Sequence, residues 1–383
     1  MIPEADRRPA ATIDVHLGAD ALRAIVPLWS ELLAASGSAN IFLTWEWMSA
    51  WCEVLGTAAV PCVLVVRNGD GAVKGLAPLY TDQRAGRSLG LRRLRLMGTG
   101  FGADHMAFIC RAGEDITPEV ADWIAGRVPE WDVAELRWVD EVQARRLAIA
   151  LERYRGHVCV LTEADPSPVV RLPATWEEYR GLLGSSHRAS LGRYARKLER
   201  ERAPVDFRRA ATAEEFGRAW SALVRLHQTR WRRRGLPGSF VKPHFEELHR
   251  QFARLALERG WLRLYHLEAR EQIIAVLYCF RYGPRVSYFQ AGFDTAWARY
   301  GPGRLLMAHA IRSSIEEGAT EFDFMRGVEE HKLRWKPELR HDYHVTIFRA
   351  RPAVITALRL QGGVRLLRRG ARRLLLSRLP RET

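Results

Sequence analysis

The sequence predicts an α/β protein made of two similar units and a basic C-terminal tail. Its 383 residues are enough for two domains of ordinary size. In each half an aromatic-rich helix precedes two strands joined by a polar turn, and the second half continues with a strand, a glycine turn, a helix and another strand. A hydrophobic content of 47% excludes a disordered chain, and no apolar run reaches the roughly 18 residues of a membrane span.

The repeated pattern defines the two units. In the first half "TWEWMSAWCEVLG" (44–56) predicts a helix, and residues 61–80 predict a hairpin that turns at Asp70–Gly71. In the second half residues 244–260 predict a helix, and residues 261–280 predict a hairpin of the same outline. The segment 161–175 is rich in proline and acidic residues and predicts a linker. We therefore expect an N-terminal domain over 1–165, a C-terminal domain over 166–350 and a tail over 351–383.

The helix after the glycine turn carries its charges in the unfavourable order. Arg304 lies in its first turn, where the backbone is already positive, and Glu316 and Glu317 lie in its last turn. A strand, turn, helix and strand in this order form a βαβ unit, and the start of such a helix binds anions, typically phosphate. We therefore expect an anion site that consists of Gly301, Gly303, Arg304 and Leu305.

A carboxylate lies in the strand that follows this helix. Asp323 stands in the middle of the apolar stretch 320–327, where an unpaired carboxylate is costly. Arg326 or Lys332 is the expected partner. The next residues place a carboxylate and two lysines on one helix face: Glu329, Lys332 and Lys336. Structural ion pairs and a functional site both remain open as interpretations.

Charge and cysteine content bear on the binding partners of the protein and on whether it holds disulfides or a metal. The formal net charge is +15, and residues 351–383 hold nine arginines and one glutamate. This tail is either a basic surface helix or an amphipathic helix that binds an anionic membrane or RNA. The five cysteines lack a C-x-x-C pair, which indicates a reducing cytoplasm and argues against disulfides or zinc. We expect no metal at His331, His341 and His344, because the last two would lie on opposite faces of a strand.

Several stretches carry a family resemblance. They include "FLTWEWMSAWCEVLG", "HQTRWRRRGLPGSF", "GWLRLYHLE" and "FDFMRGVEEHKLRW". With the strand, turn and helix described above, they resemble the GNAT acyltransferase superfamily. More closely, the chain is similar to the BioF2-like (CelD/BcsL-type) acetyltransferases, relatives of the double-GNAT Fem aminoacyltransferases. The resemblance implies two tandem GNAT-like domains. One departure is Ala298, which stands where the superfamily turn has glutamine or arginine.

The resemblance also implies a reaction and roles for residues. An acyl group would pass from acetyl-CoA or another acyl-CoA to an amine, with the pyrophosphate held at the glycine turn. A backbone amide between Tyr288 and Ala291 would polarise the acyl carbonyl, with Gln290 beside it. Glu329 is the expected proton acceptor and Lys332 the expected contact to acceptor or developing charge.

The remaining candidates concern the acceptor and the loop around it. Asp323 is expected to orient the loop that carries Glu329 and Lys332. Asp104 and His105 lie in the glycine-rich segment 98–108 and either contact the acceptor or form the turn. The complete set of expected acceptor contacts is Asp104, His105, Arg326 and Trp335.

Three functions follow as expectations. The first is acyl-CoA-dependent N-acylation of a small-molecule amine, such as an amino sugar or another precursor of a bacterial envelope or exopolysaccharide. The second is transfer of an aminoacyl group from charged tRNA, as in the Fem relatives. The third is a non-catalytic scaffold in a polysaccharide or lipid assembly. We expect a cytoplasmic protein, with peripheral contact to the inner face of the membrane through the tail as an open alternative.

Overall fold

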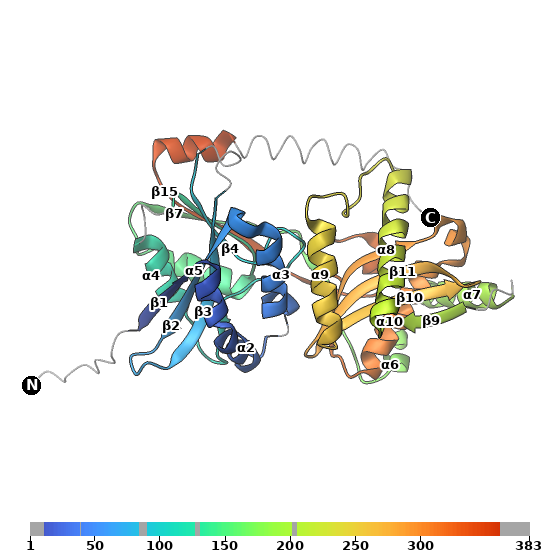
Figure 1. The fold of residues 1–383 in the computed structure, drawn as a ribbon. Coiled ribbons are helices and arrows are strands. Elements are labelled where there is room, and N and C mark those ends of the chain that lie inside the picture. The colour runs from blue at the N-terminus through green and yellow to red at the C-terminus, as the bar shows by residue number, and fades with distance from the viewer. Residues whose placement is uncertain (1–10, 39, 84–89, 127–130, 201–204, 361–383) are drawn as a thin grey trace, which may run out of the picture.

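The chain forms two mixed β-sheets, one for each half, with helices packed against them (Figure 1). The computed structural model describes residues 11–38, 40–83, 90–126, 131–200 and 205–360. The first sheet has the order β1-β2-β3-β4-β6-β15-β7, with β5 paired to β3, and the second has the order β14-β8-β13-β12-β11-β10-β9. The expected α/β fold with two units is confirmed.

The strands of the first sheet are β1 (Thr12–Leu17), β2 (Ala59–Arg67), β3 (Val73–Asp82), β4 (Arg93–Leu96), β5 (Ile109–Cys110), β6 (Val133–Asp140), β7 (His157–Glu163) and β15 (Asp342–Arg349). The strands of the second sheet are β8 (Ser167–Arg171), β9 (Val205–Arg209), β10 (Leu262–Ala269), β11 (Gln272–Tyr282), β12 (Arg285–Phe293), β13 (Glu321–Asp323) and β14 (Glu338–Arg340). The α-helices are α1 (Gly18–Ala24), α2 (Val26–Ala35), α3 (Trp45–Leu55), α4 (Thr117–Gly126), α5 (Glu141–Leu151), α6 (Trp176–Leu182), α7 (Ser185–Arg200), α8 (Ala213–Arg233), α9 (Phe245–Glu258), α10 (Pro302–Glu316) and α11 (Glu330–Leu333).

The two halves share one core topology. In the first half β2, β3 and β4 pair antiparallel in sequence, and β4 then pairs in parallel with β6 after the crossover through α4. In the second half β10, β11 and β12 pair antiparallel, and β12 pairs in parallel with β13 after α10. Both predicted hairpins and the predicted βαβ unit are therefore present, and they account for the repeat seen in the sequence.

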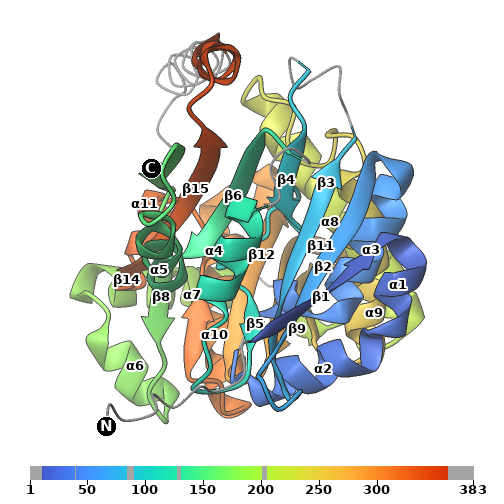
Figure 2. The same ribbon diagram turned by 90° about the vertical axis from the view of Figure 1, so that its left-hand side faces the viewer.

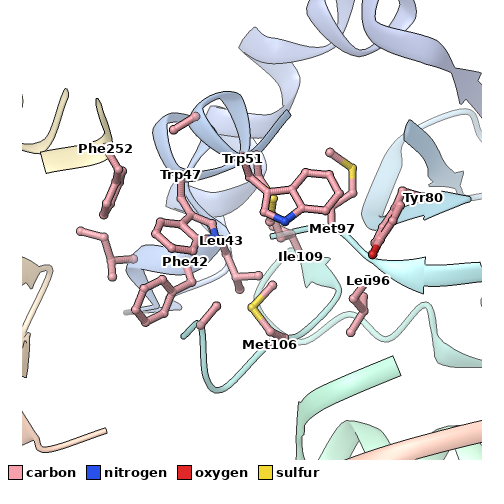
Figure 3. Close-up of a cluster of buried hydrophobic side chains, with 14 of the residues drawn as sticks. Phe42, Leu43, Trp47, Trp51, Tyr80, Leu96, Met97, Met106, Ile109 and Phe252 are labelled. Carbon is pink, nitrogen blue, oxygen red and sulfur yellow. The ribbon is translucent and has the colours of Figure 1, made fainter. Parts of the chain in front are cut away.

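The two aromatic-rich helices bring the halves together. Helices α3 and α9 pack against each other between the sheets (Figure 1). Trp47 of α3 meets the Phe252 ring of α9 edge to face, with centroids 5.0 Å apart, and both side chains are fully buried (Figure 3). Burial of large aromatic side chains is a major source of packing energy. The apolar core therefore continues from one half into the other.

The chain passes between the halves twice. Strand β7 ends at Glu163 in the first sheet and β8 begins at Ser167 in the second, so most of the predicted linker 161–175 is paired strand. Near the end of the chain β14 lies in the second sheet and β15 returns to the first, where it pairs with β6 and β7 (Figure 2). Residues 342–349, assigned from sequence to the second domain, thus complete the first sheet.

The acidic end of α10 has a structural explanation. The carboxylate of Glu317 lies within 2.6, 2.8 and 3.3 Å of the guanidinium groups of three arginines, Arg209, Arg263 and Arg281. These contacts lie among strands β9, β10 and β11 and offset the repulsion between an acidic side chain and the negative end of a helix.

One buried histidine links three segments that are far apart in the chain. The ring nitrogens of His105 lie 2.9 Å from Asp323 Oδ2 and 2.9 Å from Asp342 Oδ1. The backbone N–H of His105 also donates to Asp342 Oδ2, at 2.8 Å. Because both ring nitrogens face carboxylates, both carry protons and the ring is an imidazolium. Burial opposes this charge, but the two carboxylates outweigh it and raise the pKa of His105 to about 10.

The end of the chain extends beyond these sheets. Residues 352–360 are helical, whereas residues 361–383, most of the predicted basic tail, lie outside the described residues. Among the described residues, no helix has the length and apolar character needed to cross a lipid bilayer.

The His105 ion pairs predict a pH dependence of stability. The folded-state pKa is about 10 and the ordinary value is 6.5, so the stabilisation is complete below pH 6.5 and is lost as pH rises towards 10. We expect the free energy of unfolding to fall between pH 7 and pH 10 more steeply in the unmodified protein than in His105→Gln. Denaturant titrations across this range measure both slopes, and equal slopes would show that His105 is not charged in the folded protein.

Candidate active site

A large cleft is lined by residues of both halves of the chain. Its volume is about 1490 Å³. The first half contributes the loop 99–104 and residues around Trp138, and the second half contributes Tyr288–Phe293 of β12, the start of α10 and the segment 324–335. The cleft therefore brings together the three regions of the second half that the sequence predicted as functional.

Strand β12 presents backbone groups to this cleft. It pairs with β13 through Arg285–Ser287, and from Tyr288 onward no strand among the described residues pairs with it on that side. Its register with β11 skips one residue between Tyr288 and Gln290, so Phe289 is the extra residue of a β-bulge. The Ala291 N–H donates to the side-chain oxygen of Gln290, at 3.2 Å. The segment expected to polarise a carbonyl is thus splayed, bulged and open to the cleft.

A neutral histidine fixes the far side of this bulge. Ser239 N–H donates to His227 Nε2 at 3.2 Å, so the Nδ1–H of His227 donates to the Ala291 carbonyl at 3.1 Å. Burial lowers the pKa of His227 to about 4, which keeps the ring neutral and this tautomer in place. Gln290 also donates to Ser239 Oγ, at 3.4 Å. These bonds orient the backbone of Gln290 and Ala291.

The start of α10 forms the other wall. Gly301 caps the helix with φ of +60°, and a Cβ there would lie 2.8 Å from the Tyr194 ring of α7. Glycine is therefore required at this turn. Arg304 donates to the Tyr194 hydroxyl at 3.1 Å and its guanidinium lies 5.5 Å from the centre of that ring. Gly303 lines the cleft, and a Cβ there would make only ordinary contact with Phe293, at 3.5 Å.

Leu305 does not take part in this wall. Its N–H donates to the Gly301 carbonyl as the first bond of the helix, and its side chain is buried against a small apolar pocket with Trp176 and Phe207. The prediction that Leu305 binds the cofactor was therefore wrong, because the helix itself uses that amide.

The surroundings of the helix start are cationic. Basic residues of the second half that line the cleft include Arg230, Arg234, Lys242, Arg304 and Arg334. Burial lowers the pKa of His187, which also lines the cleft, and the charges of Arg304 and Arg334 lower it further. An anionic group is therefore favoured here over a cation.

The segment after β13 is fixed by contacts that the sequence did not predict correctly. Asp323 is fully buried and pairs with His105, not with Arg326 or Lys332, and it accepts the Met325 N–H at 2.8 Å. Burial would raise the pKa of Asp323, but His105 holds it at about 2. The carboxylate is therefore charged and orients the turn in which Met325 has φ of +57°.

Lys332 closes the same loop. Its ammonium donates to the carbonyls of Met325, Arg326 and Gly327 at 3.2, 2.9 and 3.1 Å and lies 2.9 Å from Glu329 Oε2. The side chain is 8% exposed. Lys332 lines the cleft, and its N–H groups all have acceptors within the loop, so in this structure it holds the loop. Its contact to the acceptor or to developing charge stays a prediction.

The other predicted acceptor contacts divide into two groups. Asp104, Arg326 and Trp335 line the cleft, whereas His105 lies behind it in the buried ion pairs. Arg326 Nε lies 2.8 Å from Asp104 Oδ1, and the guanidinium lies 3.6 Å from the centre of the Trp138 ring. Burial raises the pKa of Asp104, and the charge of Arg326 opposes that rise.

Trp335 and Glu329 differ in exposure. Trp335 is 2% exposed, its carbonyl accepts the Tyr179 hydroxyl at 2.8 Å, and its ring meets His187 edge to face. The Glu329 side chain is 56% exposed at the cleft. Burial raises the pKa of Tyr288 on β12, and the charge of Glu329 is the smallest of the contributions.

Sequence reasoning did not identify four residues that shape the cleft: Tyr194, His227, Phe289 and Trp138. Nothing in their local pattern distinguishes them from core residues, although the arginine-rich surroundings of Tyr194 were noticeable. The structure gives Trp138 an unusual backbone conformation, with φ of +60°, which its sequence surroundings do not reveal. Among the described residues, no group of three or more potential ligands is arranged to hold a metal ion.

Comparisons with known proteins agree with this geometry. Residues 185–333 match the family model described as an acetyltransferase (GNAT) domain. A comparison with curated protein sequences found no match. Among solved structures, FemX has a TM-score of 0.61 and 10% sequence identity, with 84% of this chain and 95% of that chain covered. A conserved protein of unknown function from Bacteroides thetaiotaomicron VPI-5482 has a TM-score of 0.54 and 11% identity, with 85% and 97% covered.

A further similar structure is L-PGS from Bacillus licheniformis, with a TM-score of 0.50 and 14% identity over 87% of this chain and 94% of that chain. At such identities the likeness concerns the fold, and the family match concerns the second half, where the bulged strand and the glycine turn lie. Residues 185–333 therefore match a GNAT acetyltransferase domain, within a chain whose fold is similar to that of FemX.

Proposed function

We propose that the protein is an acyl-CoA-dependent N-acyltransferase of the BioF2-like type, which transfers an acyl group, in the first instance acetyl, to an amine. The observation that carries the proposal is the open, bulged segment Tyr288–Ala291 beside the cationic start of α10, in one cleft. A thioester carbonyl and a compact phosphate group need these two features side by side.

The donor end of the cleft suits coenzyme A. Gly303 lines the cleft and has no side chain, so its backbone can approach a small anion more closely than that of a larger residue. Arg304 adds a positive charge, and Tyr194 holds it in place. The backbone of Tyr288–Ala291 would then meet the acyl carbonyl, with Gln290 beside it.

In the proposed reaction the acceptor amine attacks the thioester carbonyl. A backbone N–H of the bulged strand stabilises the oxyanion while the new C–N bond forms. The C–S bond then breaks, and the thiolate leaves and takes up a proton. Glu329, directly or through water, accepts the proton that the amine loses. Asp323 and Lys332 act indirectly, because they hold the loop that carries Glu329.

The acceptor end is lined by side chains of both halves. Asp104 and Arg326, with Trp138, are the proposed contacts to the acceptor, and Trp335 shapes the wall behind them. We propose a small-molecule amine, such as an envelope or exopolysaccharide precursor, and a cytoplasmic location with peripheral contact to the membrane.

Transfer from charged tRNA is the second candidate. Helix α7 is strongly amphipathic and basic, with Arg193, Arg196, Lys197 and Arg200 near the cleft wall that carries Tyr194. A tRNA needs such an extended basic surface, and its affinity falls steeply with salt. A non-catalytic scaffold is less well supported, because the open strand and the cationic helix start both remain in place.

Donor binding separates these candidates. We expect acetyl-CoA or another acyl-CoA to bind with modest salt dependence, and Gly303→Val to weaken it about tenfold or more, because the added side chain blocks the approach of the anion. Isothermal calorimetry measures the affinity for acyl-CoA, and filter binding measures the affinity for charged tRNA, each at several salt concentrations. Thermal melting is the control, since the space at Gly303 predicts a small change in stability. Tight, salt-sensitive tRNA binding without acyl-CoA binding would overturn the proposal in favour of the second candidate.

The proton acceptor has a matched control in the next residue. Glu329→Gln keeps the side-chain shape and leaves the three carbonyl contacts of Lys332, so we expect a melting temperature close to that of the unmodified protein. Turnover should fall by about 10²-fold or more. Glu330 also lines the cleft but pairs with Arg334, so Glu330→Gln should retain most of the activity. Steady-state rates of both variants at saturating donor measure the difference. Full activity in Glu329→Gln would exclude Glu329 as the base.

A further inference from the structure

We propose that the loop 98–105 of the first half positions the bulged strand of the second half, and that Gly102, Phe289 and His249 are positioning residues for acyl transfer. The expected effect on catalysis rests on the proposed function, because the bulge is the segment that would polarise the acyl carbonyl. The contacts themselves are independent of which acyl donor is used.

Gly102 lies close to the ring of Phe289, the extra residue of the bulge. Its φ is +104°, and a Cβ built there would be 2.5 and 2.7 Å from the Cζ and Cε2 atoms of Phe289. Contacts below 3 Å are not tolerated without movement of one partner. The loop of the first half therefore sets how far the Phe289 ring can extend away from its strand.

The Phe289 ring is half-buried at the edge of the cleft, and aromatic rings from both halves pack against it. Its centroid lies 4.2 Å from that of His249, 5.6 Å from Tyr278, 6.2 Å from Phe42 and 6.2 Å from Phe245. These rings come from both halves of the chain. These contacts restrict how the ring can respond to a Cβ at Gly102, so we expect part of the displacement to reach the backbone of the bulge, where Phe289 is the extra residue.

His249 holds the loop on the side of the second half. It is fully buried, and burial lowers its pKa to about 3, so the ring is neutral. Its Nε2–H donates to the Phe101 carbonyl at 2.8 Å, directly before Gly102. On the side of the first half, Trp47 and Trp51 donate to the carbonyls of Gly98 and Thr99 at 3.0 and 2.9 Å. The loop is therefore fixed at both ends and acts as a rigid stop.

This arrangement predicts a selective effect on the chemical step. The residues that would bind the donor phosphate lie on α10 and α7, whereas the three atoms nearest to a Cβ at Gly102 all belong to Phe289 of β12. A displaced bulge should misalign the backbone N–H groups and lower kcat, while the KM for acyl-CoA changes little. A misplacement on the order of 1 Å at a reacting centre costs about 10²-fold in rate.

The loop offers its own control. Gly100 has φ of +99°, close to that of Gly102, but a Cβ there meets no atom within 4 Å. Gly100→Ala and Gly102→Ala therefore impose similar backbone strain, and only Gly102→Ala pushes on Phe289. We expect kcat to fall at least tenfold more in Gly102→Ala than in Gly100→Ala, with KM for acyl-CoA within about twofold in both. Phe289→Leu, which removes the clashing ring atoms, should restore part of the kcat of Gly102→Ala.

Hydrogen exchange supplies a readout that does not depend on activity. The amides of Tyr288–Ala291 should exchange faster in Gly102→Ala than in Gly100→Ala, and the Phe289→Leu double variant should reverse part of the change. If the unmodified protein transfers no acyl group, the proposed function fails, but hydrogen exchange still tests the contact between Gly102 and Phe289. If Gly102→Ala does not fold, recovery of folding in the double variant supports the contact, and continued misfolding overturns it. Equal kinetics and equal exchange in Gly100→Ala and Gly102→Ala also overturn it.

Discussion

The structure depends on one buried charge, the imidazolium of His105 between the carboxylates of Asp323 and Asp342. Charges this deeply buried are costly unless each is paired and hydrogen-bonded, and here the three groups satisfy one another. Asp323 stands where β13 ends and the cleft loop begins, and Asp342 is the first residue of the strand that returns to the first sheet. One histidine from the first half therefore fixes two turning points of the second.

The neighbours of His105 extend the same connection. Each residue from Phe101 to His105 contacts the second half: Phe101 through His249, Gly102 through Phe289, Ala103 and Asp104 through Arg326, and His105 through Asp323. The first half thus supplies a rigid surface against which the strand and loops of the GNAT domain are built. Together with the shared core of α3 and α9, this explains why the cleft is lined by both halves.

Much of the fold follows from local signals, and much of the site does not. The hairpins, the βαβ unit and α10 were predictable because periodicity and turn residues are local. The need of Asp323 for a partner was also predictable, but the partner lies 218 positions away and no local pattern identifies it. The bonds of Lys332 to three loop carbonyls were not predictable, because they depend on how the loop turns. The amide of Leu305 is used by the helix, and the predicted linker 161–175 contains strand residues on both sides of the crossing between the sheets, because hydrogen bonding within a helix or sheet overrides residue type.

The central claim is that the loop of the first half and the cleft loop of the second half open together, because His105 joins them. Amide exchange at Met106, Met325 and Arg326 tests this most directly, since their N–H groups bond to Trp138, Asp323 and Asp104 at the junction. The account predicts that the three amides share one opening free energy, and that His105→Gln lowers all three by the same amount. Loss of protection at Met106 alone, with Met325 and Arg326 unchanged, would contradict it.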